Sequence, residues 1–483
     1  MITIKVNNNW AHINASKEII QVLDNELSPY VPNAFWIQKQ HERHFRYNEK
    51  CVLCRNSGWD LRKHFVSRNG RFPAGLLNRV IRILSNYCGI NDVVVEDHRI
   101  KPVGEPWEHK VTLREDQRAL ADAFLRGERG CIEAATAFGK TIVNVVLAAE
   151  LGVQTLVITP TRELAAQYAD RFLEHGGIKS SVWKGSPPWE MGIINIATQQ
   201  ILYRHLSYLD NLNIPFLIVD EAHHAVSKTW YKTIMEIKSY YRLGQSATLP
   251  LDDDWGLLHI EACIGPLLGK VSAKQLGNRL AAIKAFIVNV DNDNWFGARS
   301  YIDEYRRNLV YSDKRNSYIE SLIRAIVKAG LRAMVLCAWG EHVENLFARC
   351  VDLYPKVDWV IASIDSDKKV HEKKHALDKG TTQVIIATTV FDEGVDVPDL
   401  DVIIMAGGGM AEGRTKQRIG RVRRLGRTGK GAIIDFHDSH YMSKHSKVRK
   451  AIYIEDGCEV INCGQAPPDS VVKLVVDWVN NRG

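Results

Sequence analysis

The stretch that most constrains the fold of this chain is a short loop that ends in Gly139, Lys140 and Thr141. A mostly apolar segment at residues 130–133 precedes the loop, and a run of mostly aliphatic residues at 142–149 comes after it. Small residues let the backbone turn tightly and point its N–H groups inward, at a helix N-terminus whose dipole favours anions. The pattern therefore predicts a strand, a phosphate-binding loop and a helix. Lys140 is expected to reach the phosphates and Thr141 to bind Mg²⁺.

Two positions of this loop depart from the usual phosphate-loop pattern. Ala134 stands where the pattern begins with Gly, and Ala137 occupies a place where Gly is common. A Gly-Lys-Thr sequence is also compatible with an ordinary turn that starts a helix. The assignment therefore depends on the motifs found later in the chain.

Three continuous apolar runs lie beyond the loop, at residues 155–159, 193–197 and 216–219, and helical segments separate them. This alternation predicts a parallel sheet that is buried on both faces. The third run leads directly into Asp220 and Glu221. Because such sheets bind ligands at the carboxyl ends of their strands, we expect Asp220 to hold Mg²⁺ and Glu221 to polarise an attacking water.

Residues 300–445 show the same alternation of apolar runs and helical segments. Buried strands are predicted at four apolar runs, 333–338, 384–388, 402–406 and 432–436. Between the last two runs, Arg418, Arg421 and Arg424 recur at three-residue spacing and lie on about one helix face. Guanidinium groups in this arrangement can stabilise phosphate charge as arginine fingers. A basic helix face that binds DNA, or one that is simply solvated, is the alternative.

The first 105 residues carry a local basic excess. Between residues 43 and 82 there are ten Lys and Arg against two acidic residues, with aromatic residues interleaved. Such a surface suits a phosphate backbone, although a solvated charged face is the alternative. We expect Arg62, Lys63 and Arg68 to contact DNA. Four further residues could together bind zinc: His41, His44, Cys51 and Cys54. The alternative is that they belong to a charged loop that runs into a strand.

Size and composition bound the class of protein. A chain of 483 residues is too long for one core, so several domains are expected. The 63 Lys and Arg against 56 Asp and Glu give a net charge of +7, which permits a polyanionic partner. No apolar run reaches the roughly 18–20 residues of a membrane span, and no secretory leader is read at the N-terminus. Nine Cys scattered over the chain suggest reduced thiols and not a disulfide framework. The expected location is therefore the cytoplasm, or the host cytoplasm if the chain is phage-encoded.

In their order along the chain, these motifs resemble those of the superfamily 2 helicases. The resemblance covers roughly residues 110–440. The matching segments are 113–117 (Q motif), 135–141 (motif I), 160–164 (motif Ia), 197–199, 220–223 (motif II), 246–248 (motif III), 334–339 (motif IV), 387–396 (motif V) and 417–424 (motif VI). The resemblance implies two RecA-like lobes with ATP and Mg²⁺ between them, in a protein that we expect to be a monomer.

The resemblance also implies roles for individual residues. The implied nucleotide contacts are Arg114, Gln117, Ala137, Gly139, Lys140, Thr141, Gly394, Asp396 and Gln417. The implied catalytic residues are Lys140, Asp220, Glu221, Arg421 and Arg424, with Mg²⁺ on Thr141 and Asp220. Contacts to the backbone of one DNA strand are implied for Thr161, Arg162, Thr198 and Thr388. Coupling of hydrolysis to movement is implied for His223, Ser246 and Thr248.

The DNA-type branch of the superfamily fits best. Residues 242–248 resemble a segment of XPB-like and UvsW-like helicases, and residues 45–47, 59–62 and 72–77 keep the order of a UvsW-type N-terminal module. This resemblance implies an ATP-dependent helicase or translocase for branched DNA: forks, D-loops and four-way junctions in replication, recombination or repair. Three alternatives stay open: the motor subunit of a restriction or defence complex, a nucleotide-gated clamp without strand separation, and RNA as the substrate.

The expected architecture is therefore an α/β fold with two tandem RecA-like parallel-sheet domains, at residues 106–290 and 291–445. A small basic N-terminal α+β domain occupies residues 1–105. A short C-terminal helical tail occupies residues 446–483, and its apolar segment at 471–479 is expected to pack as a helix.

Overall fold

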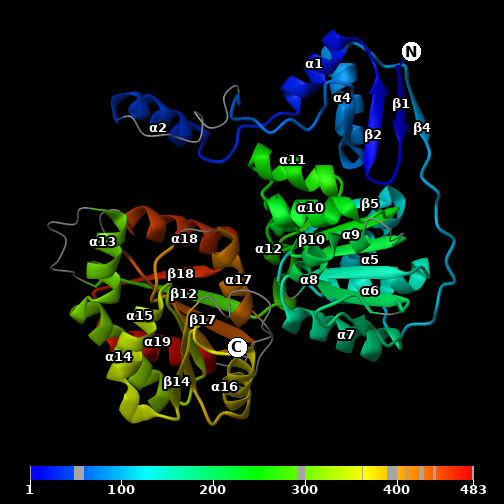
Figure 1. Cartoon of the computed structure of the whole chain (residues 1–483). Coiled ribbons are helices and arrows are strands. Elements are labelled where there is room, and N and C mark those ends of the chain that lie inside the picture. The colour runs from blue at the N-terminus through cyan, green and yellow to red at the C-terminus, as the bar shows by residue number, and fades with distance from the viewer. Residues whose placement is uncertain are drawn as a thin grey trace. The chain divides into compact units, whose positions relative to one another are not determined.

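The chain forms two compact units, one of residues 1–133 and 139–270, the other of residues 134–138 and 271–483 (Figure 1). Each unit contains a seven-stranded parallel sheet, and the first unit also contains a four-stranded sheet near the N-terminus. The predicted α/β fold with two RecA-like sheets is confirmed. The computed structural model describes residues 2–47, 59–136, 138–188, 190–209, 212, 214–290, 300–361, 363–388, 400–409, 412–423, 429–438 and 442–480.

The N-terminal domain is a small sheet with strand order β3-β2-β1-β4. Strand β1 (Ile2–Val6) alternates buried and exposed residues, as its sequence predicts, and it pairs antiparallel with β2 and parallel with β4. Helices α1 and α4 pack against each other beside this sheet and share its hydrophobic core. The further elements are β2 (Trp10–Asn14), α1 (Lys17–Glu26), α2 (Ala34–Tyr47), β3 (Arg71–Pro73), η1 (Ala74–Leu76), α4 (Leu77–Cys88) and β4 (Val93–Asp97).

The first seven-stranded sheet has the order β11-β5-β10-β9-β6-β8-β7. Five of its strands are buried along their whole length. Strands β6, β8 and β9 are mostly apolar, as expected for a sheet covered on both faces. Strands β5 and β10 also carry buried polar residues, among them Glu133 and Arg242. The strands are β5 (Arg129–Ala134), β6 (Thr155–Thr159), β7 (Ser181–Val182), β8 (Ile194–Thr198), β9 (Phe216–Asp220), β10 (Tyr241–Ser246) and β11 (Leu267–Val271). The helices are α5 (Glu115–Gly127), α6 (Lys140–Leu151), α7 (Arg162–Gly176), α8 (Gln199–Arg204), α9 (Leu206–Leu209), η2 (Ala222–Val226), α10 (Lys228–Glu236) and α11 (Asp254–Cys263).

The N-terminal domain packs tightly on α11 and β10 of this sheet. A Cβ added to Gly75 would lie 1.9 Å from the carbonyl oxygen of Glu261, so only Gly allows this approach. Arg79 forms a 2.5 Å ion pair with the Glu261 carboxylate. The buried Arg242 donates hydrogen bonds to the side chain of Asn9 and to the carbonyl of Cys263. The N-terminal domain and the first sheet therefore form one compact unit.

The second seven-stranded sheet has the order β14-β15-β13-β16-β17-β12-β18. Alternate side chains along its strands enter two separate hydrophobic clusters, so helices α14, α15 and α19 pack on one face and α16, α17 and α18 on the other. The strands are β12 (Ala282–Val288), β13 (Ala333–Leu336), β14 (Val357–Val360), β15 (Val384–Ala387), β16 (Val402–Ile404), β17 (Lys430–Phe436) and β18 (Glu459–Gly464). The remaining elements are α12 (Ala273–Leu276), η3 (Gly277–Arg279), α13 (Tyr301–Tyr305), η4 (Arg306–Val310), α14 (Asp313–Lys328), α15 (Gly340–Arg349), η5 (Val351–Leu353), α16 (Asp367–Lys379), α17 (Glu412–Val422), α18 (Ser443–Glu455) and α19 (Pro468–Asn480).

Two features of the second unit differ from the sequence-based expectation. Strand β12 pairs in parallel with β17, so the second sheet begins before the expected boundary at residues 290 and 291. The C-terminal segment contributes the edge strand β18, which pairs with β12, in addition to the expected helix α19. The sequence of β18 is partly polar and half-buried, unlike the continuous apolar runs of the central strands, because an edge strand is covered on fewer sides.

Candidate functional site

The residues expected to bind the nucleotide gather at one edge of the first sheet. Strand β5 ends at Ala134, β9 ends at Asp220 and β10 ends at Ser246. The parallel register places Ser246 opposite Glu133 and Gln245 opposite Asp220. The three strand ends therefore lie side by side, at the edge where parallel sheets bind ligands.

The loop after β5 requires glycine at its last position. Gly139 has a φ of 92°, in the left-handed region, and it is the N-cap of α6. A Cβ at this position would also lie only 2.7 Å from Nε2 of Gln117. The Oε1 atom of Gln117 accepts a hydrogen bond from the backbone N–H of Arg114 at 3.1 Å, which closes a capping box at the start of α5. The structure thus brings two of the expected nucleotide contacts, Gln117 and Gly139, together, and Lys140 and Thr141 form the first turn of α6.

The two acidic residues at the end of β9 differ in their electrostatics. Burial, followed by the negative charge of Glu221, raises the pKa of Asp220, against the opposing influence of Lys140. Burial also acts to raise the pKa of Glu221, but the hydrogen bond from His223 and the charge of Lys140 outweigh it and lower that pKa. Glu221 has a φ of 48°, a left-handed conformation that costs a non-Gly residue roughly 1 kcal/mol or more. Two crowded carboxyl groups in a buried place fit a divalent cation, whose charge would offset theirs.

The residues expected to couple hydrolysis to movement form one connected cluster. His223 Nδ1 lies 2.9 Å from Ser246 Oγ and 3.3 Å from the Glu221 carboxylate. Ser246 Oγ also accepts a hydrogen bond from the backbone N–H of Thr248 at 3.1 Å. The cluster therefore connects the acidic pair after β9 to the loop after β10.

Sequence reasoning missed one residue of this site, Tyr168. Its buried hydroxyl group accepts a hydrogen bond from Asn144 Nδ2 at 2.9 Å, and it lies close to the side chains of Thr141 and Asp220. Burial raises the pKa of Tyr168 well above its ordinary value, so the hydroxyl keeps its proton. The only sequence signal is a pair of polar side chains, Asn144 and Tyr168, on helix faces that are otherwise apolar.

The three residues expected to hold a DNA strand in this unit lie further along the same edge. Thr161 is the N-cap of α7 and its hydroxyl accepts a hydrogen bond from the N–H of Leu164 at 3.3 Å. Arg162 is exposed at the start of α7. Thr198 ends β8 opposite Thr159, and it is only 3% exposed, which leaves little of its hydroxyl for a ligand. Because β6 and β8 lie beyond β9 in the strand order, these residues occupy the other half of the edge from the phosphate loop.

The expected residues of the second unit are described in part. Thr388 comes directly after β15, and its backbone N–H donates to the carbonyl of Val360 at 3.1 Å. Gln417 and Arg421 both lie on α17. Four expected site residues lie outside the described residues: Ala137, Gly394, Asp396 and Arg424.

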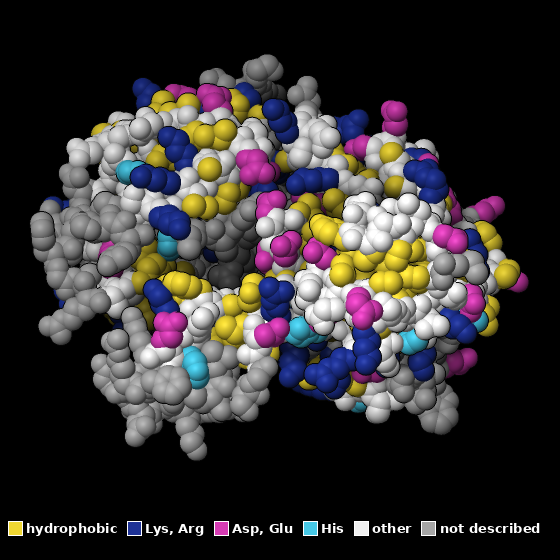
Figure 2. All heavy atoms as spheres, turned by 90° about the horizontal axis from the view of Figure 1, so that it is seen from above, with side chains coloured by type: hydrophobic (Ala, Val, Ile, Leu, Met, Phe, Trp, Pro, Cys, Tyr) yellow, Lys and Arg dark blue, Asp and Glu magenta, His cyan; other side chains and the backbone are white. Residues whose placement is uncertain are grey.

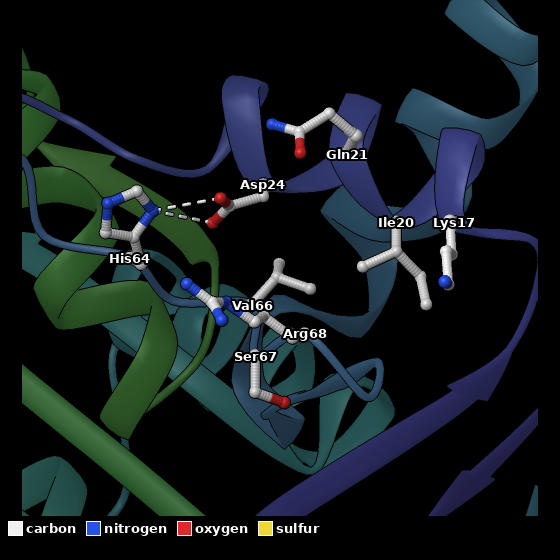
Figure 3. A pocket seen from close by; sticks show the side chains of 8 residues that line it. All are labelled: Lys17, Ile20, Gln21, Asp24, His64, Val66, Ser67 and Arg68. Carbon is white, nitrogen blue, oxygen red and sulfur yellow. Dashed lines mark hydrogen bonds and ion pairs between the residues drawn. The ribbon is translucent and has the colours of Figure 1, made fainter.

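The three expected DNA contacts of the N-terminal domain have different neighbours. The Arg62 guanidinium lies 4.4 Å from the centre of the Tyr30 ring, and Lys63 Nζ lies 5.9 Å from that of Phe65. Arg68 lines a pocket of about 660 Å³ with Lys17 (Figure 3). On the face seen in Figure 2, Lys and Arg side chains stand in several groups among acidic and hydrophobic ones. The Lys and Arg side chains therefore form no unbroken basic patch in that view.

The loop that carries these residues is fixed by His64. Its Nδ1 lies 2.9 Å from both carboxylate oxygens of Asp24 on α1, as Figure 3 shows, and its Nε2 lies 3.1 Å from Asp60. The zinc hypothesis stays open because Cys51 and Cys54 lie outside the described residues. Within the described ranges, no group of three or more His, Cys, Asp or Glu residues is placed to hold a metal ion.

Comparison with known proteins agrees with this geometry. The family described as type III restriction enzyme, res subunit, matches residues 110–251, and the helicase conserved C-terminal domain matches residues 315–426. Together they span the expected nucleotide motifs of both units. The chain belongs to the superfamily 2 helicases.

Individual relatives are similar to the chain over most of its length. The chain is 27% identical to the DNA 3'-5' translocase XPB2 of Sulfurisphaera tokodaii, over 71% of this chain and 86% of that protein. It is 21% identical to the ATP-dependent DNA helicase uvsW of Enterobacteria phage T4, over 85% of this chain and 87% of that one. The solved structure of S. cerevisiae Dbp5 bound to RNA and ADP BeF3 aligns with a TM-score of 0.58 and 16% identity, over 76% and 93% of the two chains, which shows a shared fold. In the described part of the chain, every helix is too short or too polar to cross a bilayer.

Proposed function

We propose that this protein is an ATP-driven motor that moves along DNA and unwinds or branch-migrates forks, D-loops and four-way junctions. The observation that supports it most is the arrangement at one edge of the first sheet. The phosphate loop, the acidic pair and the His223–Ser246 contact lie at adjacent strand ends, and the expected strand-binding threonines lie further along the same edge. Such an arrangement lets a change at the nucleotide reach the DNA through a short chain of contacts.

In this proposal, Lys140 binds the phosphates of ATP and Glu221 orients the attacking water. Thr141 and Asp220 would hold Mg²⁺, for which their oxygen ligands are suited. When bound, Mg²⁺ supplies charge neutralisation for the phosphates. Gln117 and Arg114 contact the adenine. From the second unit, Arg421 and Arg424 support hydrolysis, and Gly394, Asp396 and Gln417 contact the nucleotide.

The proposed DNA contacts are addressed to the phosphate backbone. Hydroxyl groups and one exposed guanidinium, on Thr161, Thr198, Thr388 and Arg162, suit a motor that does not depend on sequence. The names of the relatives, a DNA translocase and a DNA helicase, support DNA as the substrate. The basic loop with Arg62, Lys63 and Arg68 is proposed to bind duplex ahead of the two sheets.

The test compares wild-type protein with Lys140→Ala. ATP hydrolysis is measured with single-stranded, duplex, forked and four-way DNA, and with RNA as a control. Branched DNA should stimulate the wild type most strongly, and the variant should lose hydrolysis but keep DNA binding. Turnover retained by Lys140→Ala contradicts the assignment of the ATP site, and stimulation by RNA alone contradicts DNA as the substrate.

A second candidate function is the motor subunit of a restriction or defence complex. It is supported by the match of residues 110–251 to the res subunit of type III restriction enzymes. Strand displacement and translocation assays on the same DNA separate the two functions. Translocation without displacement favours the restriction motor, or a clamp that remodels protein–DNA complexes.

A further inference from the structure

Three aromatic side chains stand exposed where α2 begins. Tyr30 is 58% exposed, Phe35 is 61% exposed and Trp36 is 59% exposed. Burial of a large aromatic ring contributes more favourable free energy than burial of a smaller side chain. Other aromatic residues of this domain, Phe65 and Phe72, are buried in its core. Neighbouring exposed rings of this size therefore indicate a surface that meets a ligand.

Each of these rings has a cation beside it. Lys39 Nζ lies 4.5 Å from the centre of the Phe35 ring and 5.5 Å from that of Trp36. The Arg62 guanidinium lies 4.4 Å from the centre of the Tyr30 ring and donates a 3.1 Å hydrogen bond to its hydroxyl. The Phe35 and Trp36 rings meet edge to face with their centres 5.6 Å apart. Aromatic faces beside positive charge suit a ligand that carries both flat rings and phosphates.

Backbone hydrogen bonds hold this surface on the domain. The N–H of Val31 donates to the carbonyl of Leu61 at 2.8 Å, and the N–H of Lys63 donates to that of Pro29 at 3.0 Å. The segment that carries Tyr30 is thereby attached to the loop that His64 fixes on α1. The start of α2 is in turn connected to this segment by the hydrogen bond from the N–H of Ala34 to the carbonyl of Val31.

We propose that Tyr30, Phe35, Trp36, Lys39 and Arg62 form a stacking surface for unpaired nucleotides of DNA. Unpaired bases offer free faces that stack on aromatic rings, whereas the bases of a duplex are already stacked on one another. Lys39 and Arg62 complement the charge of the phosphates between those bases. This inference rests on the proposed function, because it takes DNA as the substrate, and it adds a site for the single-stranded part of a branched molecule.

The test uses the full-length protein and the double variant Phe35→Ala/Trp36→Ala. Binding is measured with a labelled single strand of dT, a fork with unpaired arms, and a blunt duplex of equal length. Affinity for the single strand and the fork should fall about tenfold or more, while affinity for the duplex changes less than about twofold. Tyr87→Ala, which removes a ring that is 63% exposed on α4, should leave all three affinities unchanged.

The conservative variant Phe35→Tyr/Trp36→Tyr keeps flat rings and should bind the single strand as the wild type does. An equal loss on duplex and single strand, or no loss on either, overturns the proposal, and the second outcome assigns the surface to another partner. Thermal unfolding of each variant checks that the fold is retained. A wild type that shows no DNA-stimulated hydrolysis contradicts the proposed function instead.

Discussion

The Nδ1 atom of His223 lies 2.9 Å from the hydroxyl oxygen of Ser246, and this contact joins the residues after β9 to the end of β10. The same imidazole lies 3.3 Å from the carboxylate of Glu221, the residue proposed to orient the attacking water. One side chain therefore touches both the proposed catalytic carboxylate and the segment that leads out of the next strand. A rearrangement at either position changes the hydrogen bonding of the other.

Replacing Ser246 with Ala should separate hydrolysis from movement. The variant keeps Glu221 and Lys140 but removes the hydroxyl that connects His223 to the loop after β10. Strand displacement should therefore fall about tenfold, as expected for the loss of one hydrogen bond, while ATP hydrolysis keeps most of its rate. Both activities are measured on the same forked DNA.

Ser239→Ala is the matched control for this variant. The Ser239 hydroxyl is buried but has no hydrogen-bond partner among the described residues, so its removal should change neither activity. If Ser246→Ala lowers hydrolysis and displacement by the same factor, the His223–Ser246 contact supports catalysis and not coupling.

Tyr168→Phe tests whether a buried hydroxyl positions the proposed magnesium ligands. The hydroxyl accepts a hydrogen bond from Asn144 and lies close to Thr141 and Asp220, so its loss changes the surroundings of two proposed ligand side chains and leaves Asn144 without this partner. The Mg²⁺ concentration that gives half-maximal binding of a fluorescent ATP analogue should rise about 2- to 10-fold, as for one lost hydrogen bond. The binding measurement does not depend on turnover, and kcat at saturating Mg²⁺ should change less.

The control for Tyr168→Phe is Tyr305→Phe. The Tyr305 hydroxyl is buried without a hydrogen-bond partner in the described ranges, and its removal should leave the Mg²⁺ dependence unchanged. An unchanged Mg²⁺ dependence in Tyr168→Phe, together with a lower melting temperature, would assign the hydroxyl to stability alone.

Much of the first sheet could be predicted from the sequence because its strands are buried on both faces. The apolar runs at 155–159 and 216–219 coincide with β6 and β9, apart from one residue added to the end of β9. The nucleotide residues could be placed because parallel strands end at a common edge. Tyr168 could not, since nothing local distinguishes a tyrosine that packs in a helix interface from one whose hydroxyl contacts a strand end.

The sequence was less informative where packing between distant segments decides the structure. Arg242 was recognised only as part of a motif, whereas the structure gives it three buried acceptors, one of them on Asn9. Strand β18 was missed because its burial depends on the neighbouring β12 and not on its own pattern. The Asn9 contact and the β12–β18 pairing join residues more than a hundred positions apart, and periodicity within a segment carries no information about them.

Arg242→Met should destabilise the first unit. The guanidinium donates to the carbonyls of Ile237 and Cys263 and to the side chain of Asn9, and it is fully buried. Removal of the donors leaves buried acceptors unsatisfied, which should lower the free energy of unfolding by about 3 kcal/mol or more. Urea denaturation measures this change. Arg126→Ala, at an exposed position of α5, should stay within about 0.5 kcal/mol of the wild type.

Because Asn9 belongs to the N-terminal domain, the same variant should also loosen that domain from the first sheet. Proteolysis of the extended segment between β4 and α5, residues 98–114, should become faster in Arg242→Met than in the wild type. If stability falls but this segment stays equally resistant, Arg242 supports the sheet alone and does not hold the two parts together.

The contacts of His64 with Asp24 and Asp60 should make the stability of the N-terminal domain depend on pH. Burial acts to lower the pKa of His64, but the hydrogen bonds and charges of Asp24 and then Asp60 outweigh it and raise the pKa above its ordinary value. A histidine whose pKa is raised by folding stabilises the folded state fully below the unfolded pKa of about 6.5. That stabilisation is lost as the pH rises through the higher folded-state pKa.

The variant His64→Gln removes this titration, so the difference in unfolding free energy between wild type and variant should be larger at pH about 6 than at pH about 8.5. Other groups near the ring are Ser28, which contacts both His64 and Asp24, and the cations Lys17 and Arg68, which line the same pocket. Asp24→Asn should reduce the pH dependence in the same direction, because it removes the first of the two carboxylates. A difference that grows with rising pH would contradict the assignment of a protonated His64 between Asp24 and Asp60.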